Sequence, residues 1–185
     1  MSKVYIFFAD GFEEIEGLTV VDLLRRANID ITMVSVTGNK NVTGAHQITT
    51  VADVLFEEVD FSDADLLVLP GGMPGTVKLM EHDGLDKLLR EFNSKGKALA
   101  AICAAPGVLG TKGILEGKNA TCYPGHEDKL IGAHIINNPV VADGNITTSK
   151  SMGTAIDFSL FLIKSIRGEA EAQKVAEAIK YQHYN

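Results

Sequence analysis

Short apolar runs alternate with helical patterns along almost the whole chain, and this alternation constrains the fold most strongly. Strand-like runs cover 3–8, 29–36, 66–69, 97–102, 119–122 and 140–148. The spacing of apolar residues predicts helices at 15–28, 79–92, 104–112, 154–166 and 170–181. A small hairpin is expected over 42–51, and Thr154 with Asp157 fits a helical capping box. Such alternation favours an α/β fold, with a mostly parallel sheet covered by helices on both faces.

The length of 185 residues predicts a single domain over 1–185. A hydrophobic fraction of 45% and a charged fraction of 22% are ordinary for a globular protein and exclude a disordered or collagen-like chain. The longest uncharged stretch, 98–111, is shorter than the roughly 20 residues that a membrane span needs. The apolar run at 4–9 is too short for a signal peptide, so a cytoplasmic location is expected.

Charge and side-chain spacing exclude several classes of partner. The formal net charge is −7, and the longest basic run is the pair Arg25-Arg26, so neither nucleic acid nor an anionic membrane is expected to bind. Two cysteines do not make a disulfide framework. The spacing of the histidines does not match a metal-binding motif, so we expect no metal; the histidines are His46, His82, His126, His134 and His183. No nucleotide-binding motif occurs either, so we expect no cofactor.

Ligands of open parallel sheets bind at the carboxyl ends of the strands. In this chain the segments that follow predicted strands are 10–16, 70–75, 103–106 and 149–153. These four segments are therefore the candidates for a functional site.

Cys103 follows a predicted strand and precedes a predicted helix, and two interpretations of it stand side by side. Ala101 and Ala105 are small enough for a nucleophile elbow, and a helix N-terminus favours a thiolate. Alternatively, Cys103 is a small buried hydrophobic residue, which is common for a free cysteine. Cys122, inside a strand-like run, is interpreted as structural.

Backbone and carboxyl groups near Cys103 could assist it. Gly71 and Gly72 allow backbone N–H groups to point into the crevice, where they would form an oxyanion pocket with the amide of Ala104; an ordinary strand-end turn is the alternative. Glu13 and Glu14 are expected to be solvated near a helix N-terminus. Glu16 lies beside the apolar position Ile15 and can turn inward, where burial would raise its pKa.

Four segments together resemble the DJ-1/ThiJ/PfpI superfamily, and within it the branch of the YajL-like proteins and the parkinsonism-associated deglycase. The matching segments occur in family order across nearly the whole chain, as Asp10 to Glu16, Val68 to Gly72, Ala100 to Pro106 and Gly153 to Phe158. The resemblance implies a flavodoxin-like three-layer sandwich that forms a homodimer.

For the site, the resemblance implies a reactive Cys103 thiolate on a strained elbow, a protonated Glu16 touching its sulfur, and backbone donors at Gly72 and Ala104. Members of the family are described as cofactor-independent glyoxalases, protein deglycases, oxidation sensors and chaperones. We therefore expect either turnover of small 2-oxoaldehydes or their adducts, or oxidation of Cys103 by peroxide to a sulfinic acid.

Some positions depart from relatives in the superfamily. The protease-like branch has a His directly after the nucleophile, where this chain has Ala104, which argues against a peptidase. Tyr123, His46 and Lys150 stand where relatives carry a His and two Arg, so substrate preference is open. A glutamine amidotransferase is excluded because no late His-x-Glu pair is present. Cys122 as a resolving thiol is a further alternative.

Overall fold

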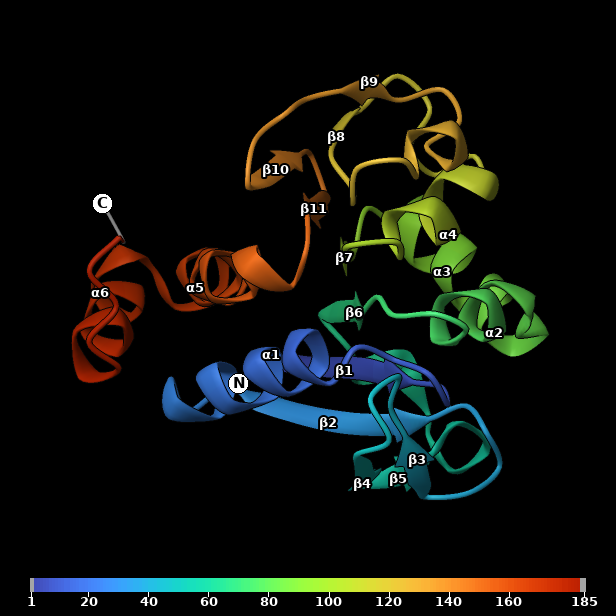
Figure 1. The fold of residues 1–185 in the computed structure, drawn as a ribbon, viewed down its shortest axis with the longest axis horizontal. Coiled ribbons are helices and arrows are strands. Elements are labelled where there is room, and N and C mark those ends of the chain that lie inside the picture. The colour runs from blue at the N-terminus through green and yellow to red at the C-terminus, as the bar shows by residue number, and fades with distance from the viewer. Residues whose placement is uncertain (1, 184–185) are drawn as a thin grey trace.

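A seven-stranded sheet forms the centre of the computed structural model, which describes residues 2–183 (Figure 1). Its strands are β1 (Lys3–Phe8), β2 (Asp30–Ser35), β5 (Val54–Leu55), β6 (Leu66–Leu69), β7 (Ala98–Ile102), β10 (Val140–Asp143) and β11 (Ile146–Ser149). Their order is β10-β11-β7-β6-β1-β2-β5, and the β10–β11 hairpin supplies the antiparallel pair of this otherwise parallel sheet. The predicted mostly parallel α/β sheet is confirmed.

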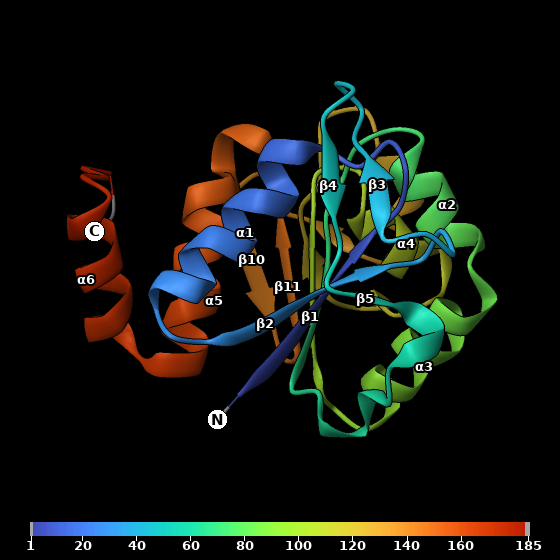
Figure 2. The same ribbon diagram turned by 90° about the horizontal axis from the view of Figure 1, so that it is seen from below.

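Helices cover both faces of the sheet, as Figure 2 shows. On one side lie α1 (Glu14–Arg26) and α5 (Ala155–Arg167), with α6 (Glu169–Ala178) packed outside α5. On the other side lie α2 (Gly75–Glu81), α3 (Asp83–Ser94) and α4 (Pro106–Thr111). Among residues 2–183, no helix combines the length and the apolar character that a membrane crossing requires.

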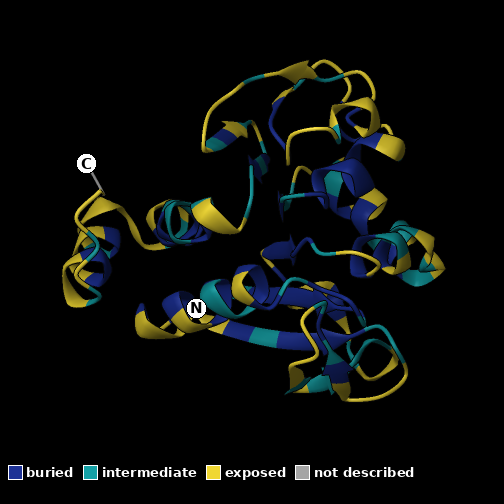
Figure 3. Ribbon diagram, in the orientation of Figure 1, coloured by how far each residue is buried: buried dark blue, intermediate teal, exposed yellow. Residues whose placement is uncertain are grey.

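The central strand β1 connects two hydrophobic cores because its side chains alternate between the faces of the sheet. Val4, Ile6 and Phe8 join the core under α1, α5 and α6. Tyr5 and Phe7 join the core under α2, α3 and α4. All five side chains are almost completely buried, and Figure 3 shows the same burial along the central strands. The continuous apolar run at 3–8 is therefore explained by a strand that is covered on both sides.

Two short strand pairs lie outside the main sheet. The predicted hairpin over 42–51 is confirmed as β3 (Asn41–Thr43) with β4 (Thr49–Val51). The predicted strand over 119–122 is shorter, since β8 (Asn119–Ala120) pairs with β9 (His134–Ile135). Within residues 2–183, four single turns of 3₁₀-helix complete the regular structure, at Phe56–Glu58, Phe61–Asp63, Glu127–Lys129 and Met152–Thr154.

The helix predicted over 79–92 is two helices in the structure. His82 has an extended backbone conformation, with φ −78° and ψ 106°, which ends α2 and begins α3. Its Nδ1 accepts a hydrogen bond from the N–H of Leu85 at 3.0 Å and thereby caps α3. A cap of this kind is not visible in apolar spacing, because His is not among the usual N-cap residues.

Two further sequence predictions need correction. The segment 140–148 is a hairpin that turns at Gly144, rather than one strand. The predicted capping box of Thr154 with Asp157 is wrong, because the Thr154 side chain makes no capping bond to α5. Its hydroxyl lies 2.8 Å from the hydroxyl of Ser149 and accepts from the N–H of Ser151 instead. Thr154 thus fixes the turn that follows β11.

Candidate active site

The carboxyl ends of three neighbouring strands bring the predicted site residues together. Strand β6 lies between β1 and β7, so the loops after these strands meet at one edge of the sheet. Glu16 comes from the loop and helix after β1, Gly71 and Gly72 follow β6, and Cys103 follows β7. The sequence-based choice of these segments is therefore supported by their placement in the fold.

Cys103 stands at a sharp, strained turn. Its φ of +66° lies in the left-handed region, which costs a non-glycine residue about 1–3 kcal/mol. Two backbone hydrogen bonds hold this conformation: its N–H donates to Ser149 O at 2.9 Å, and its carbonyl accepts from Tyr123 N–H at 2.8 Å. Ala101 and Ala105 on either side are fully buried, as the close packing of an elbow requires.

The helix after Cys103 begins later than the sequence predicts. Helix α4 starts at Pro106, so Ala104 belongs to the turn and not to the helix. The backbone N–H groups of Ala104 and Gly72 act on the sulfur instead, and both lower the pKa of the thiol. These two amides favour a thiolate, but burial outweighs them.

Glu16 turns inward, and only 1% of it is exposed. Its Oε2 accepts a hydrogen bond from the N–H of Gly71 at 2.9 Å. Its Oε1 is buried and has no hydrogen-bond partner within residues 2–183. Burial raises the pKa of Glu16 to about 7, because a charged carboxylate with an unpartnered oxygen is costly away from water.

Gly71 separates Glu16 from Cys103, and only a glycine fits there. A Cβ atom on Gly71 would lie 2.6 Å from Glu16 Oε2, 2.6 Å from Cys103 Cβ and 3.1 Å from Cys103 Sγ. The sequence predicts that the backbone N–H of this glycine points into the crevice. Because Gly71 has no side chain, the carboxyl of Glu16 and the thiol of Cys103 can also approach each other beside its backbone.

The two acids change each other's protonation. Burial and the charge of an ionised Glu16 raise the pKa of the Cys103 thiol to about 12. The second of these effects disappears when Glu16 itself carries the proton, which its own raised pKa favours near neutrality. The pair therefore has two forms with one proton: a thiol beside a carboxylate, or a thiolate beside a carboxylic acid.

Glu14 is not solvated as predicted, since only 3% of it is exposed. Burial by itself would raise the pKa of Glu14, but hydrogen bonds, including those from the backbone N–H groups of His46 and Ile48, outweigh it and lower the pKa. His46 Nδ1 lies 3.0 Å from Glu14 Oε2, and this contact together with the charges of Glu13 and Glu14 raises the pKa of His46. Sequence spacing gave no signal of this cluster, because His46 lies on the β3–β4 hairpin.

Tyr123 and Lys150 are two positions at which the resemblance implies other residues, and Cys122 precedes the first of them in the sequence. Tyr123 is exposed and touches Cys103 through its backbone. Lys150 donates to Asn137 Oδ1 at 2.5 Å. Cys122 is a buried free thiol whose Sγ lies 3.4 Å from Tyr123 O, and burial raises its pKa to about 11. Its assignment as structural or resolving stays a prediction.

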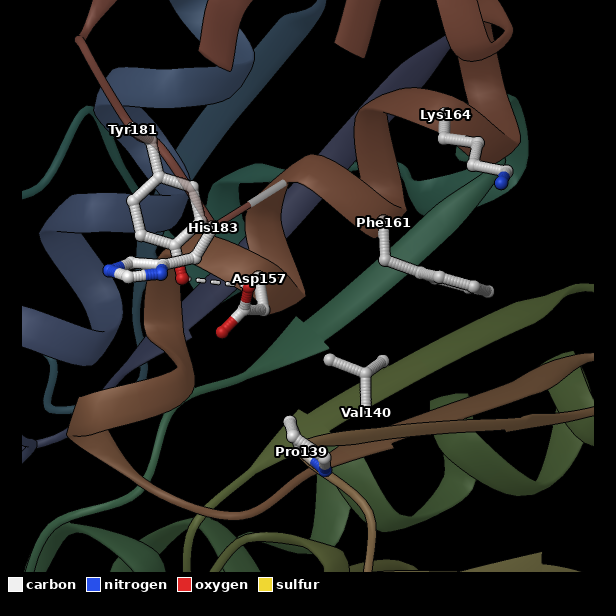
Figure 4. Close-up of a pocket in the computed structure, with 7 residues that line it drawn as sticks. All are labelled: Pro139, Val140, Asp157, Phe161, Lys164, Tyr181 and His183. Atoms are coloured by element: carbon white, nitrogen blue, oxygen red, sulfur yellow. Dashed lines mark hydrogen bonds between the residues drawn. The ribbon is translucent and has the colours of Figure 1, made fainter. Parts of the chain in front are cut away.

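A separate cavity of about 450 Å³ lies between α5, the edge strand β10 and the segment after α6 (Figure 4). Tyr181 donates to Asp157 Oδ1 at 2.8 Å across it. Phe161 and Val140 form its apolar wall. This cavity contains no thiol, and it does not include Cys103 or Glu16.

The chain is similar to known proteins over most of its length. The model of the DJ-1/PfpI family matches residues 2–165. The chain is 40% identical over 176 residues to Protein DJ-1 homolog B of Arabidopsis thaliana, covering 94% of this chain and 40% of that protein. It is 35% identical over 182 residues to Protein dj-1beta of Drosophila melanogaster, covering 97% of each. A deglycase of Pyrococcus abyssi is 35% identical over 154 residues, 82% of this chain and 91% of that protein.

Among solved structures, oxidized DJ-1 of Toxoplasma gondii matches with a TM-score of 0.95 and 33% identity, covering 99% of this chain and 100% of that one. This similarity extends to the whole α/β fold, including the flavodoxin-like arrangement expected from the sequence. The chain spans less than half the length of the two Arabidopsis relatives.

The raised pKa of Glu16 predicts a specific pH dependence of stability. A carboxyl with a raised pKa favours the folded state at low pH, and this contribution is lost as the pH rises through about 7. Glu16→Gln keeps an oxygen for the N–H of Gly71 but cannot ionise. Relative to this variant, the unfolding free energy of the wild type should fall by on the order of 3 kcal/mol between about pH 4.5 and pH 8.

Urea unfolding at a series of pH values measures this difference. The exposed carboxyl of Glu57 provides the control, since Glu57→Gln should leave the pH profile of the wild type unchanged. A wild-type minus Glu16→Gln difference that is constant across this pH range would contradict the assignment.

Proposed function

The chain belongs to the DJ-1/PfpI family, and on that premise we propose that it is a cysteine-dependent stress-response protein with glyoxalase or deglycase activity. It acts on small 2-oxoaldehydes or their adducts and needs no cofactor. The observation that carries the proposal is the pair of acids at the sheet edge: a buried Glu16 carboxyl with a free oxygen, next to a thiol on a strained elbow. The named deglycase among its relatives supports the same class of chemistry.

The proposed reaction begins from the form with a Cys103 thiolate and a protonated Glu16. The thiolate attacks the aldehyde carbon of the 2-oxoaldehyde, and the carboxyl of Glu16 donates its proton to the resulting oxyanion, giving a hemithioacetal. The N–H groups of Gly72 and Ala104, which already favour negative charge on the sulfur, stabilise the oxyanion before it is protonated.

Glu16 then acts as the base and the acid of an isomerisation. Its carboxylate removes the proton from the former aldehyde carbon and returns it to the neighbouring carbon, while the hydroxyl proton moves from the former aldehyde oxygen to the neighbouring ketone oxygen. These two proton transfers convert the hemithioacetal into a 2-hydroxyacyl thioester. Water hydrolyses the thioester to a 2-hydroxy acid and restores the thiol and the carboxyl with one proton between them. The net change is addition of one water, with no external oxidant or reductant.

Lactate formation from methylglyoxal tests the enzyme function. The wild type should form lactate, Cys103→Ala should lose turnover, and Glu16→Gln should lose at least about 100-fold because proton transfer then has no group to carry it. Cys122→Ala is the matched control and should retain activity, since its thiol lies outside the proposed chemistry. Turnover that persists in Cys103→Ala or in Glu16→Gln would contradict the mechanism.

A second candidate function is an oxidation sensor or chaperone without turnover. The buried Glu16 carboxyl, which lies within hydrogen-bond reach of Cys103, favours it, because a protonated carboxyl donates to an oxygen added to that sulfur. The match to an oxidized relative from Toxoplasma gondii agrees with this chemistry. If the wild type makes no lactate, a mass gain of two oxygens at Cys103 after peroxide would support the sensor; its absence would contradict it.

We also propose that the protein forms a homodimer through the face of α1. Ile15 and Ile48 are each more than half exposed, and they line an apolar groove of about 570 Å³ with Leu18 and Ile156. A patch of this kind between a helix and a hairpin fits a second copy of the same surface. The cytoplasmic location expected from the sequence remains a prediction.

Sedimentation velocity tests the homodimer. The wild type should sediment as a dimer, and Ile15→Glu should shift it to a monomer because two carboxylates would be buried at the interface. Ile131→Glu is the matched control, since Ile131 is equally exposed but lies outside this groove. A monomeric wild type, or an Ile15→Glu variant that remains dimeric, would contradict the proposal.

A further inference from the structure

A short turn over residues 149–154 joins β11 to α5 and acts on both members of the Cys103–Glu16 pair (Figure 1). At the start of the turn, Ser149 O accepts the hydrogen bond from the N–H of Cys103 at 2.9 Å. Three residues later, the backbone N–H of Met152 lowers the pKa of the Glu16 carboxyl. The position of one backbone segment therefore affects the elbow that carries the thiol and the carboxyl beside it.

The hydroxyl of Thr154 closes this turn. Thr154 Oγ1 lies 2.8 Å from Ser149 Oγ, accepts from the N–H of Ser151 at 3.1 Å and donates to Ser151 O at 2.9 Å. We propose that Thr154 is a positioning residue of the site, whose hydroxyl holds the turn in the conformation that contacts Cys103 and Glu16. This inference rests on the role proposed above for that pair and adds a residue that acts on it through the backbone.

Burial makes the hydroxyl network rigid. Ser149 is fully buried, and its Oγ donates to Pro139 O at 2.8 Å. The same carbonyl accepts from the N–H of Lys150 at 3.2 Å, so the network also ties the turn to the residue before β10. Without the hydroxyl of Thr154, Ser149 Oγ loses one of its partners and the N–H of Ser151 loses this acceptor. Losing partners of buried polar groups is costly, so the turn would shift rather than stay in place.

Both contacts of the turn are sensitive to such a shift. The left-handed backbone of Cys103 is strained, and strain of this kind persists only where the surroundings enforce it; Ser149 O supplies one of the enforcing bonds. Glu16 Oε1 has no hydrogen-bond partner within residues 2–183, so the nearby N–H of Met152 matters for the charge that the carboxyl can carry. Supporting residues of this kind commonly set the precision of a functional site.

Two substitutions at Thr154 separate its hydroxyl from its shape. Thr154→Val removes the hydroxyl at nearly the same volume, and the backbone N–H of residue 154 still donates to Ser151 O at 2.9 Å, so the turn can form. Thr154→Ser keeps the hydroxyl and should behave as the wild type does. Thr111→Val is the matched control, because Thr111 Oγ1 donates to Gly107 O at 2.9 Å within α4 and not within this turn.

Amide hydrogen exchange measures the contact with Cys103. In Thr154→Val, the N–H of Cys103 should exchange at least about 10-fold faster than in the wild type, because Ser149 O is no longer held against it. Thr154→Ser and Thr111→Val should leave this rate unchanged. The N–H of Gly11, which is bonded to the β3–β4 hairpin, should keep its rate in Thr154→Val. Unchanged exchange at Cys103, or equal acceleration at Gly11, would overturn the proposal.

Urea unfolding at a series of pH values measures the contact with Glu16. The stability difference between a protein and its Glu16→Gln counterpart falls as the pH rises and levels off near the pKa of Glu16. Because the N–H of Met152 lowers that pKa, Thr154→Val should move the levelling-off to a pH at least about half a unit higher, and Thr154→Ser should not move it. The titratable groups that act on Glu16 are Cys103 and Glu13, and both are retained in these proteins.

The two measurements separate this inference from the enzyme function. Neither uses methylglyoxal, so a wild type that forms no lactate contradicts the proposed function alone. A Thr154→Val variant that matches the wild type in either the exchange of Cys103 or the pH profile overturns the positioning role, whatever its activity.

Discussion

The close approach of Glu16 and Cys103 across Gly71 is the constraint on which the site depends. A single Cβ at Gly71 would collide with both residues, so the pair depends on the glycine that lies in the loop after β6. The left-handed backbone of Cys103 is fixed by Ser149 on the neighbouring strand β11 and by Tyr123. The strand order of the sheet therefore positions a strained thiol that no local sequence preference would favour.

Burial and backbone amides act in opposite directions on this pair. Burial raises the pKa of both acids, and the N–H groups of Gly72 and Ala104 favour charge on the sulfur alone. The N–H of Gly71 favours charge on Glu16 in the same way, although Oε1 of that carboxyl has no hydrogen-bond partner within residues 2–183. Burial outweighs the amides at both groups, so each pKa lies above its ordinary value, and the glyoxalase and sensor proposals both rest on the form of the pair in which the carboxyl holds the proton.

Local sequence patterns predicted the parts of the structure that depend on periodicity. The central strands, the β3–β4 hairpin and the segments after β1, β6 and β7 follow from apolar runs and turn residues. Contacts between distant segments were not predictable in this way, namely the burial of Glu14 by the hairpin and the spacer role of Gly71, because the folded sheet alone brings these partners together. The cap that His82 places on α3 is local, but it was also missed because His is not a usual N-cap residue.

The pair of Glu16 and Cys103 works as proposed only if the proton that they share lies on Glu16. The ultraviolet absorbance of the Cys103 thiolate tests this location most directly. The ultraviolet difference spectrum of the wild type minus Cys103→Ala isolates this sulfur from Cys122 as the pH is raised. With the proton on Glu16, the thiolate band of Cys103 should already be present at neutral pH. A band that appears only as the pH approaches 12 would place the proton on sulfur, with burial dominant, and would contradict the account.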